Sequence, residues 1–167
     1  MTSSVDEFPD ELMVATADIA DARIHPAMQE LLRLIRVEFN MDVAFLAEFV
    51  GDRRVFRDID GSEDFDLFAS GDSHGLEESL CQRVVDGRMP RIVQDMRAWR
   101  ALQQSPDLAA PLGSHAGVPV FRHDGSVYGT LCCFSFGPRT TLGEVELQRL
   151  EMSAQIAARL LDDADGL

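Results

Sequence analysis

Residues 117–136 read GVPVFRHDGSVYGTLCCFSF, and this stretch decides the fold. Two apolar runs flank His123-Asp124-Gly125, and an Asp-Gly pair favours the positive φ angles of a tight hairpin turn. We therefore predict a β-hairpin whose strands cover residues 116–121 and 127–136. The second strand is the most apolar part of the chain.

A second hairpin is predicted upstream. Gly51-Asp52 is a turn signal between strands over residues 42–50 and 54–59. The first of these strands alternates, placing four apolar residues on one face: Val43, Phe45, Ala47 and Phe49. Asp58 and Asp60 alternate on the returning strand and suggest a solvated face.

Helical spacing of apolar residues predicts helices on both sides of the hairpins, over residues 24–40 and 142–161. Thr141 and Glu144 have the spacing of a capping box for the second helix. The final helix carries two apolar stripes, whereas packing on a sheet needs only one. We interpret the second stripe, Val145, Met152, Ile156 and Leu160, as a contact with the other helix or with a partner subunit.

The chain between the hairpins is expected to form an insert. It comprises a loop over 61–75, a short helix over 76–86 that Gly87 closes, and a short strand at 91–93. The irregular segment over 95–111 would be anchored by Trp99 and Leu102. The fold class is therefore α+β, with a central antiparallel sheet and flanking helices. The predicted divisions are an N-terminal helical extension (1–23), the domain (24–162) and a disordered tail (163–167).

Composition narrows the function. The net charge of −14 argues against binding to nucleic acid or anionic lipid. All 15 basic residues are arginine, which excludes Schiff-base chemistry and a P-loop lysine. Apolar runs are too short to span a membrane, and the acidic N-terminus does not resemble a secretory signal. With three cysteines, an odd number, reduced thiols and a cytoplasmic location are expected.

No recognised catalytic or metal-binding motif is present, and the four histidines are scattered. We therefore expect no metal and no catalytic residue. Cys81 is the one residue that could change this interpretation. It lies near the start of the predicted 76–86 helix, where the helix dipole would lower the pKa of a thiol.

The order of motifs resembles the GAF domain family. Gly117-Val118-Pro119, Asp124-Gly125 and Tyr128-Gly129-Thr130-Leu131 look like its strand signature, and residues 76–95 look like its pocket helix and short strand. The closest likeness is to bacterial modules found beside cyclic-di-GMP or histidine-kinase output domains. The resemblance implies terminal helices on one face of the sheet and a ligand pocket under the insert on the other.

Carried over by position, the pocket would be lined by mostly small or apolar residues: Phe45, Ala47, Cys81, Val84, Trp99, Ala116, Val118, Thr130, Cys132 and Phe134. Such a lining favours a small, largely apolar ligand or none. The sequence identifies neither the ligand nor a cofactor. Haem-binding members of the family place an axial histidine before the Gly-Val-Pro strand. His115 is close to that position, but it would point away from the pocket if Ala116 faces in.

The resemblance implies a non-catalytic sensory domain in bacterial signal transduction that transmits its ligand state through its terminal helices. Its partners would be the small ligand and a second copy of the chain, forming a homodimer through these helices, or an output domain or partner protein. One alternative is a thiol-dependent free methionine sulfoxide reductase that uses Cys81, although the 95–111 segment lacks the further cysteine of that subfamily. The other is a dimerisation scaffold with a vestigial pocket.

Overall fold

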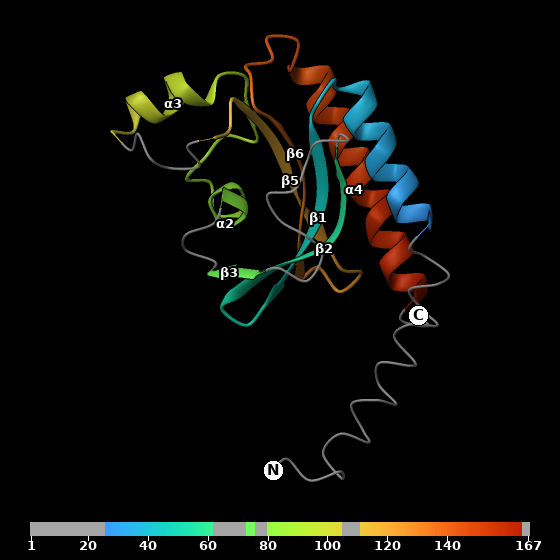
Figure 1. The fold of residues 1–167 in the computed structure, drawn as a ribbon. Coiled ribbons are helices and arrows are strands. Elements are labelled where there is room, and N and C mark those ends of the chain that lie inside the picture. The colour runs from blue at the N-terminus through green and yellow to red at the C-terminus, as the bar shows by residue number, and fades with distance from the viewer. Residues whose placement is uncertain (1–25, 62–72, 76–79, 105–110, 165–167) are drawn as a thin grey trace, which may run out of the picture.

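The computed structural model describes residues 26–61, 73–75, 80–104 and 111–164 (Figure 1). The predicted N-terminal helical extension, most of the 61–75 loop and the start of the predicted 76–86 helix lie outside these residues. So do residues 165–167 of the predicted tail. Residues 163 and 164 belong instead to the final helix, so the prediction of a tail that begins at residue 163 is wrong.

Within these ranges, six strands form one antiparallel sheet in the order β3-β2-β1-β6-β5-β4. The strands are β1 (Val43–Val50), β2 (Arg53–Gly61), β3 (Ser73–Gly75), β4 (Ile92–Val93), β5 (Ser114–Phe121) and β6 (Val127–Ser135). Both predicted hairpins, β1–β2 and β5–β6, are confirmed, and β1 joins them by pairing with β6. The end of the expected loop forms β3 at the edge of the sheet, which the sequence analysis missed.

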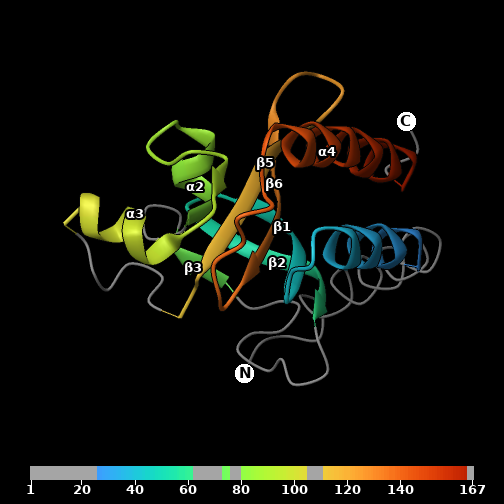
Figure 2. The ribbon, with the colours of Figure 1, turned by 90° about the horizontal axis from the view of Figure 1, so that it is seen from above.

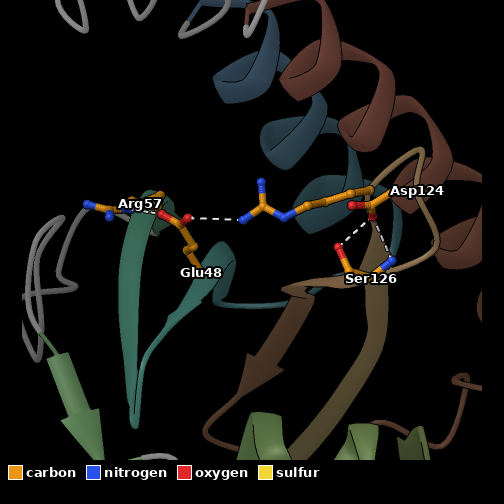
Figure 3. A network of polar contacts seen from close by, with 5 residues as sticks. Glu48, Arg57, Asp124 and Ser126 are labelled. Carbon is orange, nitrogen blue, oxygen red and sulfur yellow. Dashed lines mark hydrogen bonds and ion pairs between the residues drawn. The ribbon is translucent and has the colours of Figure 1, made fainter. Parts of the chain in front are cut away.

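The β5–β6 turn has the predicted chemistry. Gly125 has a φ of +87°, and the backbone N–H of Arg122 donates to the carbonyl of Ser126 at 2.8 Å. The Asp124 carboxylate accepts from both the backbone N–H (2.9 Å) and the hydroxyl (2.6 Å) of Ser126 (Figure 3). The aspartate therefore holds the turn in a closed form.

Glu48 connects the two hairpins near this turn through contacts with two arginines. It accepts from Nε of Arg57 on β2 at 2.8 Å and lies 3.5 Å from Nη2 of Arg122 (Figure 3). The Arg122 guanidinium also lies 5.1 Å from the centre of the Tyr128 ring. One carboxylate thus links β1, β2 and the end of β5.

The helix over residues 26–38 and α4 (Glu144–Ala164) lie side by side on one face of the sheet (Figures 1 and 2). Gln29 donates to Asp58 at 3.2 Å, and Arg36 pairs with Asp60 at 2.5 Å. The two aspartates therefore bind the helix, and the predicted solvated face is wrong. The core on this side is made by Met28, Leu32, Ile35, Phe39, Met41, Ala44, Leu46, Ala116, Val118, Val120, Tyr128, Leu131, Cys133, Leu142, Leu150, Ala154 and Ala157.

The start of α4 differs from the predicted capping box. The helix begins at Glu144, and the backbone N–H of Gly143 donates to Oε2 of Glu146 at 3.0 Å. Leu142 is buried just before the cap, and Leu147 packs against the same core, which is the arrangement of a hydrophobic staple. The cap is therefore two residues later than Thr141.

The other face of the sheet carries α2 (Leu80–Val85) and α3 (Met96–Leu102) (Figure 2). Gly87 has a φ of +81°, as expected for the residue that closes α2. Trp99 is partly buried, but Leu102 is 81% exposed, so the prediction that Leu102 anchors this segment is wrong. No helix among the described residues is both long enough and apolar enough to cross a membrane.

Candidate functional site

The insert-facing side of the central strands is lined by aromatic residues. The rings of Phe45 and Phe56 meet edge to face at 4.9 Å between centroids, and Phe45 and Phe134 do so at 6.2 Å. Apart from the aromatic rings, the cluster contains Val43, Ala47, Cys81 and Cys132. Cys81 comes from α2, so this cluster joins the insert to the sheet.

Five polar or thiol side chains are buried in and beside this apolar layer, and we call Arg54, Cys81, His115, Thr130 and Cys132 the Arg54 cluster. The four other than Arg54 are at most 1% exposed, and Arg54 is 9% exposed. They come from β2, α2, β5 and β6, which are far apart in the sequence. Buried polar groups at this density cost free energy unless they are paired or bind something.

Strand register explains how the β5 and β6 residues meet. His115 pairs with Phe134 and Gly117 with Cys132, so these four positions share one face of the sheet. A Cβ atom on Gly117 would lie 2.8 Å from Sγ of Cys132 and 3.0 Å from Cε1 of His115. The absence of a side chain at residue 117 therefore leaves room for the histidine and the thiol.

Arg54 enters the cluster because of a bulge in β2. Leu46 pairs with Asp58 but Ala47 pairs with Phe56, so the strand changes phase between them. Asp58 thus faces the terminal helices, whereas Phe56 and Arg54 face the insert. The Arg54 guanidinium lies 4.3 Å from the centre of the Phe56 ring, and its Nη1 donates to Sγ of Cys81 at 3.6 Å.

The charge of Arg54 acts on its titratable neighbours. Burial alone raises the pKa of the Cys81 thiol, but the hydrogen bond with Cys132 and the Arg54 charge reverse this and hold that pKa below its usual value. Burial and the neighbouring Cys81 raise the pKa of Cys132. Burial and then Arg54 lower the pKa of His115 to about 4, so His115 is neutral at pH 7. The site therefore combines one fixed cation, a thiol that ionises readily and a neutral imidazole.

Nδ1 of His115 is buried and has no hydrogen-bond partner among the described residues. The buried Oγ1 of Thr130 has no partner of standard geometry there either, and its polar neighbours are the thiols of Cys81 and Cys132, whose pKa values the hydroxyl lowers. An unmade hydrogen bond of this kind costs about 1–3 kcal/mol. These two atoms on one face of the sheet, beside a buried cation, are the main reason to regard this region as a binding site.

A groove of about 240 Å³ also opens between β5 and α4. Its apolar lining includes Val118 and Ala154, and Arg91 and Glu151 on its rim form an ion pair at 3.0 Å. These two charged groups are already paired and remain about half exposed, so the groove is the weaker candidate.

The structure brings together part of the predicted lining. Phe45, Ala47, Cys81, Cys132 and Phe134 pack in one cluster on the insert side. Thr130 pairs with Ala47 and lies two residues from Cys132 on the same strand, so it shares this face. Whether these residues contact a ligand stays a prediction.

Two strand residues that were predicted to line the pocket lie on the opposite face of the sheet. Ala116 and Val118 pack in the core under the terminal helices, opposite the insert. The reason is the register, because Ala116 pairs with Cys133 and Val118 with Leu131, which also face the helices. For the same reason His115 faces the insert, contrary to the prediction that it points away.

Val84 and Trp99 also lie outside the Arg54 cluster. Val84 packs in a separate core with Leu80, Met89, Val93 and Met96, and Trp99 packs against this core. The core attaches α2 to α3 and to strand β4, so both residues lie in a cluster separate from the Arg54 cluster.

Two residues of the cluster, Arg54 and His115, were not among the residues predicted to line the pocket, whereas Cys81, Thr130 and Cys132 were. Arg54 follows a turn and precedes two aspartates, so it looked like part of an exposed strand. The prediction of a helix dipole acting on Cys81 involves residues 76–79, outside the described residues, whereas Arg54 is a charge that contacts the thiol. Within the described ranges, no group of three His, Cys, Asp or Glu side chains could hold a metal ion.

Comparison with known proteins identifies the family. A GAF domain family model matches residues 22–162, and no curated protein matches the chain in sequence. The GAF domain of an Acinetobacter phosphoenolpyruvate-protein phosphotransferase superimposes with a TM-score of 0.66 at 17% identity, covering 93% of this chain and 96% of that one. The GAF domain region of a Geobacter sulfurreducens PCA protein gives 0.64 at 23% identity, with 91% and 98% covered.

Photoreceptor structures share the fold as well. The chromophore-binding domain of a bacteriophytochrome from R. palustris superimposes with a TM-score of 0.64 at 13% identity over 93% of this chain. The chain spans 63% of that domain, and 38% of a longer chain of the same bacteriophytochrome. At these identities the likeness concerns the fold.

Proposed function

The chain belongs to the GAF domain family, and from that premise we propose that it is a non-catalytic sensory domain which binds a small molecule at the Arg54 cluster. The ligand lies between the sheet and α2, and its presence is transmitted through the terminal helices to an output domain or partner protein. The setting is bacterial signal transduction in the cytoplasm, a reducing compartment that suits the three free cysteines.

One observation carries the ligand proposal: among the described residues, Nδ1 of His115 is buried without a partner on the face that α2 covers, and on the same face Oγ1 of Thr130 has only the thiols of Cys81 and Cys132 as polar neighbours. A ligand with polar atoms facing β5 and β6 would satisfy both groups and recover the free energy that they cost. The aromatic rings of Phe45, Phe56 and Phe134 provide the apolar part of the site. We therefore expect a small ligand with an apolar body and a few polar atoms.

Native mass spectrometry of the purified protein tests the proposal, together with a thermal-shift screen of metabolites. We expect either a co-purified small molecule or a ligand that raises the melting temperature. A protein that carries no bound mass and shifts with no compound would contradict the proposal.

The variant Thr130→Val tests whether the Thr130 hydroxyl contacts the ligand. It replaces a buried hydroxyl by a methyl group of similar size, so the ligand-free protein should be at least as stable as the wild type, because the hydroxyl has no hydrogen bond of standard geometry to lose. The ligand should lose at least about tenfold in affinity, which corresponds to about 1.4 kcal/mol. Chemical unfolding and titration calorimetry measure the two effects.

Thr141→Val provides the control, because Thr141 is exposed in the turn before α4. It should change neither the stability nor the affinity. If Thr130→Val destabilised the ligand-free protein and left ligand affinity intact, the hydroxyl would have a structural partner and the binding site would lie elsewhere.

We also propose that signalling involves a homodimer formed by the two terminal helices. Their outer surfaces expose Leu34 (50%), Val37 (57%), Val145 (56%), Met152 (63%) and Ile156 (46%). Large exposed apolar side chains gathered on neighbouring helices are typical of an interaction surface.

The proposed partner is a second copy of the chain, for reasons of charge. Glu38 of one helix pairs with Arg149 of the other beside the apolar residues, and Glu30 pairs with Arg33 nearby. A surface with both signs of charge can complement itself across a two-fold axis. A surface with one sign would repel its copy, especially in a chain whose net charge is −14.

Met152→Glu should weaken this dimer. Two-fold symmetry places both new carboxylates in the interface, so we expect the dissociation constant to rise at least about 100-fold, or about 1.4 kcal/mol for each copy. Analytical ultracentrifugation measures it. Gln104→Glu adds the same charge at an exposed position just after α3, on the opposite face of the sheet, and should leave the dimer unchanged. A wild-type protein that is monomeric at high concentration would refute the dimer.

A further inference from the structure

Cys81 and Cys132 form a buried pair of thiols. Both side chains pack in the buried cluster between the insert and the sheet, and each acts directly on the pKa of the other. They come from α2 and β6, about fifty residues apart in sequence. Cys81 is 1% exposed and Cys132 is fully buried. Two thiols in contact across two elements are suitably placed for a disulfide, provided that small movements bring the sulfurs to bonding distance.

Arg54 makes the two thiols chemically different. Its Nη1 donates to Sγ of Cys81 at 3.6 Å, so the ionised form of that thiol gains a charged hydrogen bond. Burial raises the pKa of Cys81, but the neighbouring Cys132 and then the Arg54 charge bring this pKa below its usual value, whereas burial and Cys81 raise the pKa of Cys132. Because the thiolate is the nucleophile, Cys81 is the thiol that reacts first and Cys132 is the one that follows.

We propose that the Cys81–Cys132 pair is a reversible oxidation site for small hydroperoxides, hydrogen peroxide above all. The Cys81 thiolate attacks one peroxide oxygen, the O–O bond breaks, and Cys81 becomes a sulfenic acid while the leaving hydroxide takes a proton to form water. The Cys132 sulfur then attacks the Cys81 sulfur, the S–O bond breaks, and the Cys132 proton leaves with the hydroxyl group as a second water. The thiols lose two electrons, and the peroxide gains them.

The oxidant must be small because both sulfurs are buried. The disulfide would join α2 to the central strand β6, on the face where the Arg54 cluster lies. It would also remove the thiolate from Arg54. Oxidation would therefore change the Arg54 cluster whether or not a metabolite binds there, and this inference does not depend on the proposed ligand.

The third cysteine is an internal control. Cys133 is also fully buried and is next to Cys132 in β6, but it faces the terminal helices and burial raises its pKa to about 12. All three thiols can thus be compared within one unmodified protein, which avoids any variant that fails to fold.

The experiment treats the reduced full-length chain with hydrogen peroxide, stops the reaction with acid, and alkylates the remaining thiols with iodoacetamide after unfolding. Peptide mass mapping should show a Cys81–Cys132 disulfide, with Cys133 alkylated, and Cys81 should react at least about tenfold faster than Cys133. A thiol reductant should restore all three thiols. Cumene hydroperoxide, a bulky oxidant, should react more slowly than hydrogen peroxide.

Two variants then show which cysteine acts in each step of the oxidation. Cys132→Ser should stop the reaction at a sulfenic acid on Cys81, which dimedone traps, whereas Cys133→Ser should oxidise as the wild type does. The proposal is overturned if Cys133 is oxidised as fast as Cys81, if peroxide leaves both Cys81 and Cys132 reduced, or if the wild-type disulfide joins other cysteines.

Discussion

Gly129→Ala is expected to destabilise the folded chain by about 4 kcal/mol or more, near the upper end of what single substitutions do. A Cβ atom at this position would lie 1.9 Å from the carbonyl oxygen of Ala47, 2.8 Å from its carbonyl carbon and 2.9 Å from the Cα of Glu48. All three atoms belong to the backbone of β1, so no side-chain rotation can relieve the clash. The strands β1 and β6 would have to separate at the centre of the sheet.

Urea unfolding followed by circular dichroism measures the loss, and a drop of about 8–16 °C in melting temperature should accompany it for a chain of this size. Gly137→Ala is the control, because its nearest neighbour would be the side chain of Arg139 at 3.3 Å, which can move. That variant should cost less than about 1 kcal/mol. Equal stabilities of the two variants would mean that β1 and β6 do not approach as closely as the structure shows.

Gly129 also illustrates what the sequence could predict. The Asp-Gly turn, the apolar strands around it and the order of helices led to the correct fold class and to both hairpins. These features are local, because a turn needs particular residues and a strand needs a period of two. The need for glycine at residue 129 is not local, since it depends on the β1 backbone about eighty residues earlier.

The composition of β5 could not predict which of its residues face the insert and which face the terminal helices. Every residue of the strand from Ser114 to Val120 is buried, so its two sides do not differ in hydrophobicity. An alternating pattern exists only where one face meets water. The assignment of Ala116 and Val118 to the insert side therefore had no physical support from the strand itself, and the register with β6 reverses it.

Arg54 was missed for a related reason. A bulge in β2, opposite Leu46 and Ala47 of β1, shifts the pairing of the two strands, and the sequence carries no clear sign of it. An unbroken alternation would place Arg54, Phe56 and Asp58 on one face. The bulge instead sends the arginine and phenylalanine to the insert side and the aspartate to the helix side. A buried arginine that follows a turn closely resembles an exposed one in sequence.

Stability is expected to fall by about 3 kcal/mol between pH 6.5 and pH 4 because of His115 alone. Burial and then the charge of Arg54 lower the pKa of His115 to about 4 in the folded chain, and its ordinary value of about 6.5 applies in the unfolded chain. Between these two values the unfolded chain binds a proton that the folded chain does not bind. Acid therefore favours unfolding, and the stability that neutral His115 contributes is complete above pH 6.5 and lost towards pH 4.

Urea unfolding from pH 7 to pH 4 measures this effect as a difference between proteins, since carboxylates also titrate in this range. His115→Gln removes the titration, so its stability should decline by about 3 kcal/mol less than that of the wild type. His123→Gln is the control, because His123 lies in the exposed β5–β6 turn, and its decline should match the wild type.

A direct titration of the wild type by NMR keeps this prediction testable if His115→Gln does not fold. The ring signals of His115 should remain those of a neutral imidazole at pH 5. Protonation of His115 near pH 6.5 would mean that the imidazole is hydrated, and that Arg54 does not act on it as the structure indicates. The binding proposal would then lose the support of the unpartnered Nδ1 atom, because an imidazole that protonates normally has water or another partner for that nitrogen. The pH dependence of His115 thus tests the same burial on which the proposed ligand site depends.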